Sequence, residues 1–256
     1  MSSAKALLLS LALAAFATGA SAQTAQEIVA AADKVRNPEQ PFHVTATLIE
    51  YKAGQPTDKN VYEVYSKIDP ATRQFRDVMT YVEPPRDAGK IVLLNGGNLW
   101  FYDPASKDSV RMSPQQRLIG QASAGDVLSE NLAVDYTPTL LGEEQVEDAD
   151  HSQRHCWHLD LKAAMDAATY NRVEYWVEQD SDYPIKAKFY SDSGRLLKIL
   201  FYRNFVTAAG RMRPTQAVII DAVDPALVTT ADFGSLRFQD IPDSWFQRDY
   251  LPHLQN

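Results

Sequence analysis

The residues best suited to chemistry form one short cluster near the middle of the chain: His151, His155, Cys156 and His158. Imidazole and thiolate groups are good metal ligands, and nearby aspartates add carboxylates. The spacing, however, matches no standard zinc pattern. On a strand, His155 and His158 point to opposite faces because their offset is odd. We therefore interpret the cluster as a polar entrance to a strand that carries a buried thiol, and we expect no metal.

Motifs for covalent or hydrolytic catalysis do not occur in the sequence. Serine, histidine and aspartate are all present, but no serine lies in a G-x-S-x-G elbow and there is no H-E-x-x-H pair. Asp192-Ser193-Gly194 is typical of a hairpin turn rather than of a nucleophile. We expect a protein that is not an enzyme and that uses no cofactor.

The first residues resemble an export signal. Lys5 supplies a positive charge, residues 6–17 form an apolar run, and Ala20-Ser21-Ala22 fits an A-x-A cleavage site. The run is too short to span a bilayer comfortably, and nothing similar follows, so we expect no membrane anchor. The sequence predicts a cleaved signal peptide over residues 1–22 and one soluble, exported domain over residues 23–256.

Charge and cysteine content narrow the classes of partner. Removing Lys5 leaves 24 of the 25 basic residues against 33 acidic ones, so the formal net charge changes from −8 to −9. A chain this acidic is a poor nucleic-acid binder. Its only local basic cluster is Arg211-Met212-Arg213, which we interpret as a solvated hairpin end.

Cys156 is the only cysteine, so no internal disulfide forms, and we expect a monomer stabilised by its core.

Three consecutive segments between Asn171 and Phe205 alternate apolar and polar residues. Such alternation places the apolar side chains of a strand on one face. Turn residues at 180–184 and 191–194 separate the segments. The pattern predicts three antiparallel strands that share an apolar face. That face is formed by Val173, Tyr175, Val177, Ile185, Ala187, Phe189, Leu197, Ile199 and Phe201.

The rest of the chain continues in the same manner after one opening helix. Thr24 and Glu27 fit a capping box, and Asn37-Pro38 ends the helix. The remaining candidate strands are 42–48, 61–68, 75–82, 90–94, 99–102, 110–112, 134–141, 156–161, 215–220 and 236–238. There is no βαβ alternation, so the pattern predicts a mainly β protein with an antiparallel sheet. A sheet of about a dozen strands is too wide to stay open without curling.

The segment 113–132 interrupts the strands. It contains Pro114, Gly120 and Gly125, and residues 123–126 are able to cap a short helix. Apolar residues follow at 127, 128 and 132. We expect this segment to cover part of the sheet.

An ordered series of short motifs runs through nearly the whole mature chain. The motifs are Arg36-Asn37-Pro38, Tyr81-Val82-Glu83-Pro84, residues 89–94, Leu99-Trp100-Phe101-Tyr102, residues 110–113, residues 141–144, residues 173–177, Tyr183-Pro184-Ile185-Lys186, residues 194–198 and Pro242-Asp243-Ser244-Trp245-Phe246. The series resembles the LolA-like family of periplasmic outer-membrane lipoprotein-sorting proteins, in particular the branch associated with resistance-nodulation-division (RND) exporters. One segment departs from that branch: residues 120–126 lack the aromatic and methionine residues of its Gly-Ser-Phe-Met-Gly-Ser-Asp-type sequence.

The resemblance implies a fold and a function. It implies a strongly curved antiparallel sheet that forms an incomplete barrel of about eleven strands, closed by a few short helices acting as a lid. A hydrophobic ligand is then held between sheet and lid. Together with the alternation, it predicts a set of residues that line the cavity and lid. They are Ile28, Val35, Phe75, Met79, Leu93, Leu118, Val127, Leu128, Leu159, Tyr175, Val177, Phe189, Leu197, Ile199 and Phe201.

Two functions follow from these observations. The first is a periplasmic carrier that takes a lipid, a lipoprotein acyl group or a similar apolar cargo from an inner-membrane RND-type exporter to an outer-membrane acceptor. The sequence does not identify the cargo, for which the candidates are a lipoprotein acyl group, a phospholipid, a polyketide-like or pigment lipid and a hopanoid. The second is a periplasmic sensor or adaptor that uses the same fold, with a filled core, to bind a protein partner.

Overall fold

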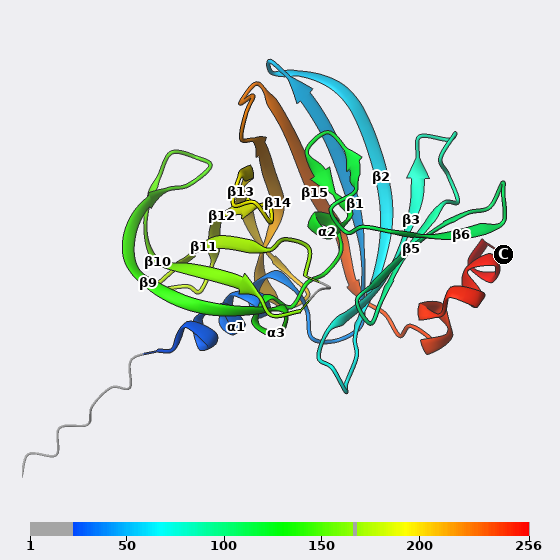
Figure 1. Ribbon diagram of the computed structural model, residues 1–256, viewed down its shortest axis with the longest axis horizontal. Helices are drawn as coiled ribbons and strands as arrows, with labels where there is room; N and C mark the ends of the chain where they lie inside the picture. Colours follow the sequence, from blue (N-terminus) through cyan, green and yellow to red (C-terminus); the bar gives the residue numbers. More distant parts are fainter. Residues whose placement is uncertain (1–22, 166–167, 256) are drawn as a thin grey trace, which may run out of the picture.

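The computed structural model describes residues 23–165 and 168–255 (Figure 1). The predicted signal peptide, residues 1–22, lies outside the described residues. Within them, no helix is both long enough and apolar enough to cross a membrane.

Thirteen strands form one antiparallel sheet, and short helices lie at its start, middle and end. The elements are α1 (Ala25–Arg36), β1 (Phe42–Lys52), β2 (Gln55–Ile68), β3 (Phe75–Glu83), β4 (Ile91–Asn95), β5 (Asn98–Asp103), β6 (Asp108–Met112), β7 (Arg117–Ile119), β8 (Ala122–Ser123), α2 (Ala124–Val127), α3 (Leu132–Asp135), β9 (Tyr136–Glu147), β10 (Gln153–Ala163), β11 (Arg172–Glu178), β12 (Pro184–Tyr190), β13 (Leu196–Ala208), β14 (Arg211–Asp221), β15 (Leu227–Phe238) and the 3-10 helices η1 (Asp243–Phe246) and η2 (Arg248–Gln255).

The sheet consists of two meanders that meet at one pairing. Its order is β6-β5-β4-β3-β2-β1-β15-β14-β13-β12-β11-β10-β9, so the first arm runs from β1 outward to β6. The second arm runs from β9 inward to β15, which pairs with β1. Strands β6 and β9 are the two edges, and the sheet therefore stays an open, curved half-barrel. Figure 1 shows the second arm on the left and the first arm on the right, with α2 between them.

The predicted fold class is confirmed in its main features, but the strand count is not. The sheet contains thirteen strands rather than about eleven, because even short segments such as the edge strand β6 join it; only β7 and β8, among the described strands, form a separate two-stranded sheet. Some boundaries also differ. Residues 134 and 135, expected to start a strand, belong to helix α3. Strand β9 extends to Glu147, because its glutamates lie on an exposed edge where they stay hydrated.

Helix α1 begins where its sequence predicts. The Glu27 amide donates to the Thr24 hydroxyl (3.2 Å), and the Glu27 carboxylate accepts from the Thr24 amide (2.8 Å), so the capping box is complete. The helix ends at Arg36, and Pro38 prevents its continuation. Its buried face, with Ile28 and Val29 fully enclosed, packs on the concave side of the second arm.

Both faces of the sheet are covered in part. The main core lies on the concave side and joins both arms with α1 and the segment between β6 and β9. On the opposite face of the first arm, Phe246 and Leu251 from the 3-10 helices cover Val78, Ile91 and Leu93. This cover closes the outer face of the first arm with a second, smaller core.

A bulge changes one face assignment in the predicted meander. Val177 pairs with Pro184 while Trp176 pairs with Lys186, so Ile185 is an extra residue. The bulge turns Ile185 to the outer face, where it packs with Trp176 and Cys156. The expectation that Ile185 shares the concave face is therefore wrong.

Candidate binding cavity

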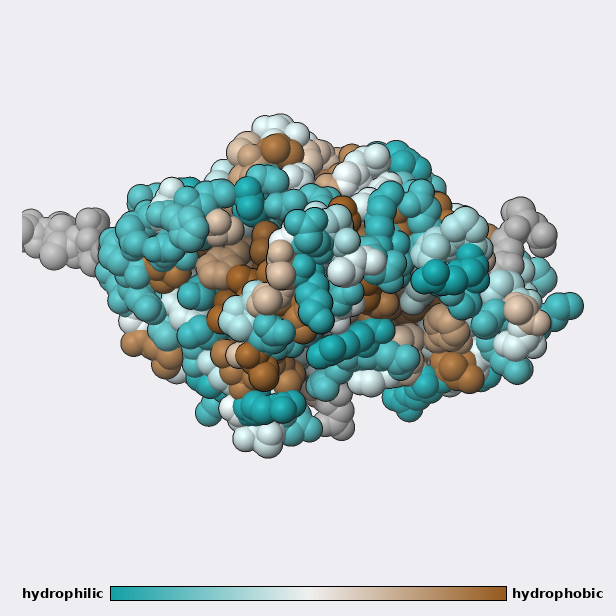
Figure 2. Space-filling model, turned by 90° about the horizontal axis from the view of Figure 1, so that it is seen from above, coloured by the Kyte–Doolittle hydropathy of each residue, from teal (hydrophilic) through white to brown (hydrophobic). Residues whose placement is uncertain are grey.

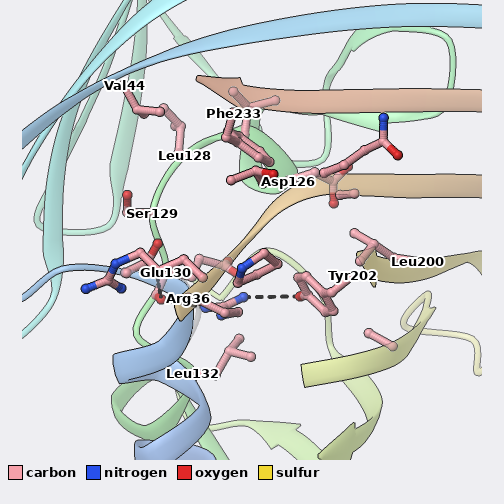
Figure 3. Close-up of a pocket in the computed structure, with 18 of the residues that line it drawn as sticks. Arg36, Val44, Asp126, Leu128, Ser129, Glu130, Leu132, Leu200, Tyr202 and Phe233 are labelled. Atoms are coloured by element: carbon pink, nitrogen blue, oxygen red, sulfur yellow. Dashed lines mark hydrogen bonds between the residues drawn. The ribbon is translucent and has the colours of Figure 1, made fainter. Parts of the chain in front are cut away.

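An apolar cavity of about 120 Å³ lies between the concave face of the sheet and the segment that links the arms. We call this segment, residues 113–135, the crossover segment. From the sheet, the apolar and aromatic lining residues include Phe42, Val44, Val173, Tyr175, Ala187, Phe189, Leu200, Tyr202, Phe233 and Leu236; from the crossover segment they are Val127, Leu128 and Leu132. Figure 3 shows Leu128 and Leu132 on one side of the cavity and Leu200 and Tyr202 on another. In Figure 2, apolar side chains show between polar ones near the middle of the upper face.

The structure places four of the predicted ligand-binding residues in the cavity wall: Val127, Leu128, Tyr175 and Phe189. Others are buried without lining it, namely Ile28, Val35, Met79, Leu159 and Val177. Phe75 lines a small neighbouring recess of about 30 Å³. Leu197 and Leu118 are half-buried and pack against the main core. The binding of a ligand by any of these residues stays a prediction.

Two predicted residues of β13 lie on the wrong side of the sheet for a cavity. Phe201 pairs with Lys186, and Ile199 pairs with Lys188, whereas Leu200 pairs with the concave residue Ala187. The inward-facing residues of β13 are thus Lys198, Leu200 and Tyr202, because directly paired residues share a face. Because residues 196, 197 and 200 are all apolar, the alternation in this strand does not show which face is the inner one. The inward position of Lys198 identifies that face, and a buried lysine is not expected from the sequence.

Leu93 also requires correction. It pairs with Val78 and Trp100 and belongs to the core beneath the 3-10 helices, on the face opposite the cavity. The four residues 91–94 are all apolar, so alternation within β4 does not distinguish its faces. The C-terminal 3-10 helices cover the outer face at this point, which is why the face is apolar here. The sequence alone does not indicate that cover.

A buried ion pair attaches the crossover segment to the second arm. The Lys198 ammonium donates to the Asp126 carboxylate and to the Gln121 carbonyl (3.2 Å). The two side chains are only 6 % and 2 % exposed. Burial lowers the pKa of Lys198, and the Asp126 charge opposes that shift. Asp126 also accepts from the Ser123 amide (2.7 Å) and the Tyr170 hydroxyl (3.0 Å), so its oxygens are well satisfied.

A second polar network joins the crossover segment to α1. Arg36 donates to the Glu130 carbonyl (2.7 Å), to the Tyr202 hydroxyl (3.3 Å) and to Asp33 (3.1 Å); the dashed line from Arg36 to Tyr202 is visible in Figure 3. Asp33 accepts from the Ala133 amide (2.8 Å). Burial raises the pKa of Asp33 to about 6, although Arg36 opposes the shift, and burial raises the pKa of Glu130 to about 7. Both carboxyl groups therefore titrate near neutral pH.

Arg213 departs from its interpretation as part of a solvated hairpin end. It is only 6 % exposed, and its guanidinium donates to the carbonyls of Lys34 and Val35 (3.0 Å each). These are C-terminal carbonyls of α1, which a cation satisfies well. Arg211, two residues earlier, is exposed. The signal in the sequence was the strand alternation of β14, which puts Arg213 on the inner face.

The thiol of the histidine cluster is buried among apolar side chains, namely Val146, Trp176 and Ile185. Cys156 is fully buried, and burial raises the pKa of its thiol to about 12. His158 stacks on Trp176 with ring centroids 4.4 Å apart. Throughout the described ranges, no group of three or more histidine, cysteine or carboxylate side chains is placed to hold a metal ion.

Comparison with solved structures places this fold among known proteins. A LolA superfamily protein from Nitrosomonas europaea matches with a TM-score of 0.79 and 34% identity, over 89% of this chain and 99% of that one. A putative outer-membrane lipoprotein-sorting protein domain from Vibrio parahaemolyticus (0.73, 18%, 89% and 98%) and a DUF1329 family protein from Desulfovibrio piger (0.72, 21%, 89% and 97%) share the fold.

A comparison with protein-family models covers most of the chain. A family model described as an uncharacterized protein-like family matches residues 74–253. The comparison with curated proteins found no match. Fold and cavity define the class as an open half-barrel with an apolar cavity under a crossover segment. The chain belongs to the LolA superfamily.

Proposed function

We propose that the protein is a periplasmic carrier that binds the acyl chain, or another apolar part, of a lipid or lipoprotein. In this proposal residues 1–22 are a cleaved signal peptide and residues 23–256 form one carrier domain. The domain receives cargo from an inner-membrane RND-type exporter and delivers it to an outer-membrane acceptor. Membership in the LolA superfamily supports the proposal, and the observation that carries it is the apolar cavity on the concave face.

Burial alone is able to hold such a cargo. Transfer of each CH2 group from water to an apolar site contributes about 0.8 kcal/mol. The cavity wall offers Leu128 and Leu132 from the crossover segment and Phe189 and Leu200 from the sheet. An apolar chain between these side chains needs no catalytic group and no metal, only an opening through which it enters.

The cavity in this conformation is smaller than an acyl chain. An apolar cavity of about 150 Å³ binds benzene, and this one measures about 120 Å³. Cargo entry therefore requires the crossover segment to move away from the sheet. That movement breaks the Lys198–Asp126 pair and the contact of Arg36 with Glu130. We infer that these two contacts hold the empty carrier closed.

An acyl-binding titration with two matched tryptophan variants tests the proposal. Leu200→Trp adds bulk inside the cavity, whereas Phe201→Trp adds the same kind of side chain at the next residue, which faces the outer side of the sheet. The expected result is that a fluorescent fatty-acyl probe binds the unchanged protein and Phe201→Trp equally, and binds Leu200→Trp at least about tenfold more weakly, a change of about 1.4 kcal/mol. If both variants bind the acyl probe equally, the cavity is not the acyl-binding site.

A sensor or adaptor that binds a protein partner without cargo is the second candidate. The observation that favours it is how completely side chains fill the concave face, with Tyr62, Met79, Leu159 and Tyr175 fully enclosed. A filled core of this kind needs no ligand for stability. If the unchanged protein does not bind the acyl probe at all, even after incubation at elevated temperature to open the crossover segment, the adaptor becomes the better account.

A further inference from the structure

The wall of the apolar cavity contains one cation that has no opposite charge beside it. The charged residues in that wall are Arg36, Asp126, Glu130 and Arg213. Arg36 pairs with Asp33, and Asp126 pairs with Lys198. Glu130 lies close enough to Arg36 for that charge to oppose the rise of its pKa. Arg213, in contrast, forms no ion pair among the described residues.

The contact of Arg213 with the end of α1 explains its position but not its charge. Its Nη1 donates to the carbonyls of Lys34 and Val35, and its Nε donates to the Ala208 carbonyl (3.3 Å). These acceptors are neutral, so a neutral donor is enough to satisfy them. Burial is the main cause that lowers the pKa of Arg213, and the like charge of Arg211 is the second. A guanidinium taken out of water without a counter-charge costs stability, and the described residues do not supply that anion.

One terminal nitrogen of Arg213 is free to bind an anion. No hydrogen bond among the described residues involves its Nη2. Nη2 is also not among the fully enclosed polar atoms that lack a partner, so it borders open space. The residue as a whole is only 6 % exposed and lines the cavity. The N–H groups of a charged nitrogen in such a place donate strongly to an oxyanion.

The surroundings of this nitrogen favour an anion that carries an apolar chain. Ala208 and Pro214 line the cavity next to Arg213, and Phe233 and Leu236 of the neighbouring strand β15 line it too. A small inorganic anion gains nothing from these side chains, whereas an attached apolar chain buries its carbon atoms against them. One uncompensated positive charge matches one negative charge. The wall is therefore suited to a carboxylate or a phosphodiester at the end of an apolar chain.

We propose that the apolar cavity binds a ligand with a singly charged oxyanion at the head of its apolar chain, and that Nη2 of Arg213 donates to this oxyanion. This class of ligand rests on the carrier function proposed above and narrows its cargo. A fatty acid and a lipid with a phosphodiester share the required chemistry, whereas a neutral ester leaves the guanidinium without a counter-charge. The two roles of Arg213 use different nitrogens, since Nη1 holds α1 and Nη2 binds the head.

Calorimetric titration with four probes of similar chain length tests the proposal. Octanoate and methyl octyl phosphate each carry one negative charge near neutral pH, methyl octanoate is neutral, and octylammonium is positive. We expect the unchanged protein to bind at least one of the two anions at least about tenfold more tightly than methyl octanoate and octylammonium. The tighter anion identifies the head as a carboxylate or a phosphodiester.

A charge-removing variant tests the role of Arg213 itself. Arg213→Gln keeps an amide donor for the helix carbonyls and removes the charge. It should bind the anions at least about tenfold more weakly, but methyl octanoate within about twofold of the unchanged protein. The neutral probe thus shows that the cavity of the variant is intact. The matched control Arg195→Gln removes the same charge from an exposed hairpin position outside the cavity and should bind every probe within about twofold.

Several results would overturn the proposal. Equal affinity for the anionic, neutral and cationic probes would overturn it and leave the carrier function standing. Equal losses of octanoate and methyl octanoate binding in Arg213→Gln would show that Arg213 acts only through the end of α1. Octanoate binding that Leu200→Trp or Arg213→Gln leaves unchanged would place the anion elsewhere. If the unchanged protein binds none of the probes, the carrier function is wrong as well.

Discussion

Two regions of the molecule use charge in opposite ways. Around most of the apolar cavity the charges are buried and paired, as in the Lys198–Asp126 contact. On β6 and at the start of β7, Arg111 and Arg117 are exposed, and their side chains make no hydrogen bond or ion pair among the described residues. Buried pairs stabilise one arrangement of the chain, because separating them leaves a charge in a poorly solvated place. Exposed, unpartnered charges contribute little to stability and are free to bind a ligand. The comparison predicts which substitutions unfold the protein and which only change binding.

The largest expected effect comes from breaking the buried pair. Asp126→Ala leaves the Lys198 ammonium buried without a counter-charge, which we expect to cost about 3–5 kcal/mol of unfolding free energy. The double variant D126A/K198M removes both charges and should recover most of that loss. Urea unfolding measures both. A loss below about 0.5 kcal/mol in D126A would contradict the role of this pair. As the matched test of an exposed charge, Arg117→Gln should change stability by less than about 0.5 kcal/mol.

The next effect is a dependence of stability on pH. Burial raises the pKa of Asp77 to about 7, well above its value of about 3.9 in an unfolded chain. Asp77 therefore contributes up to about 4 kcal/mol to the free energy of unfolding, and this contribution is fully present below about pH 4. It is lost as the pH rises through about 7. Glu130 adds a change of the same sign.

Asp77→Asn tests that assignment. The variant should unfold at a temperature that falls less between pH 5 and pH 8 than that of the unchanged protein, measured by calorimetry at several pH values. The matched control is Asp224→Asn, an exposed turn residue outside the apolar cavity, which should leave the slope unchanged. Identical slopes in all three proteins would show that Asp77 is not the titrating group.

A smaller effect distinguishes the two faces of β13. Leu200→Ala removes a side chain that is 3 % exposed and should cost about 3 kcal/mol. Phe201→Ala removes a larger side chain from the outer face, where it contacts Lys186, and should cost about 1 kcal/mol. Chemical unfolding of both variants checks the order. If Phe201→Ala lost more stability than Leu200→Ala, the side chains of β13 would face the opposite sides of the sheet from those described here.

The smallest effect separates two neighbouring arginines. Arg213→Ala removes donors from the last carbonyls of α1 and should cost about 2 kcal/mol. Arg211→Ala affects an exposed side chain and should change stability by less than about 0.5 kcal/mol. Thermal unfolding of the two variants measures the difference. Equal losses would show that Arg213 does not hold the helix end.

Most of the fold was predictable because it depends on local pattern. The capping box at Thr24, the hairpin at 95–98 and the three strands after Asn171 each follow from side-chain period or turn chemistry. Alternation failed where a strand is apolar on both faces, as at Leu93, or where a bulge adds a residue, as at Ile185. The face of a strand depends on which segment covers it, and that segment lies far away in the sequence.

The site was predictable only in part, for a related reason. Apolar lining residues such as Tyr175 and Phe189 were found because cavity wall and core share one pattern. The polar residues that close the cavity were missed. A lysine inside an alternating strand is normally assigned to solvent, and only the arrival of Asp126 from the crossover segment makes its burial favourable. No signal in one sequence pairs residues that are 72 positions apart.

The most direct test of the carrier account is to purify the mature protein from the periplasm without detergent, extract it with organic solvent and analyse the extract by mass spectrometry. The account predicts an apolar molecule, such as a lipid or an acyl chain, in stoichiometric amount, and its absence from the Leu200→Trp variant. An empty extract that stays empty after incubation with membrane lipids would contradict the account and favour the adaptor.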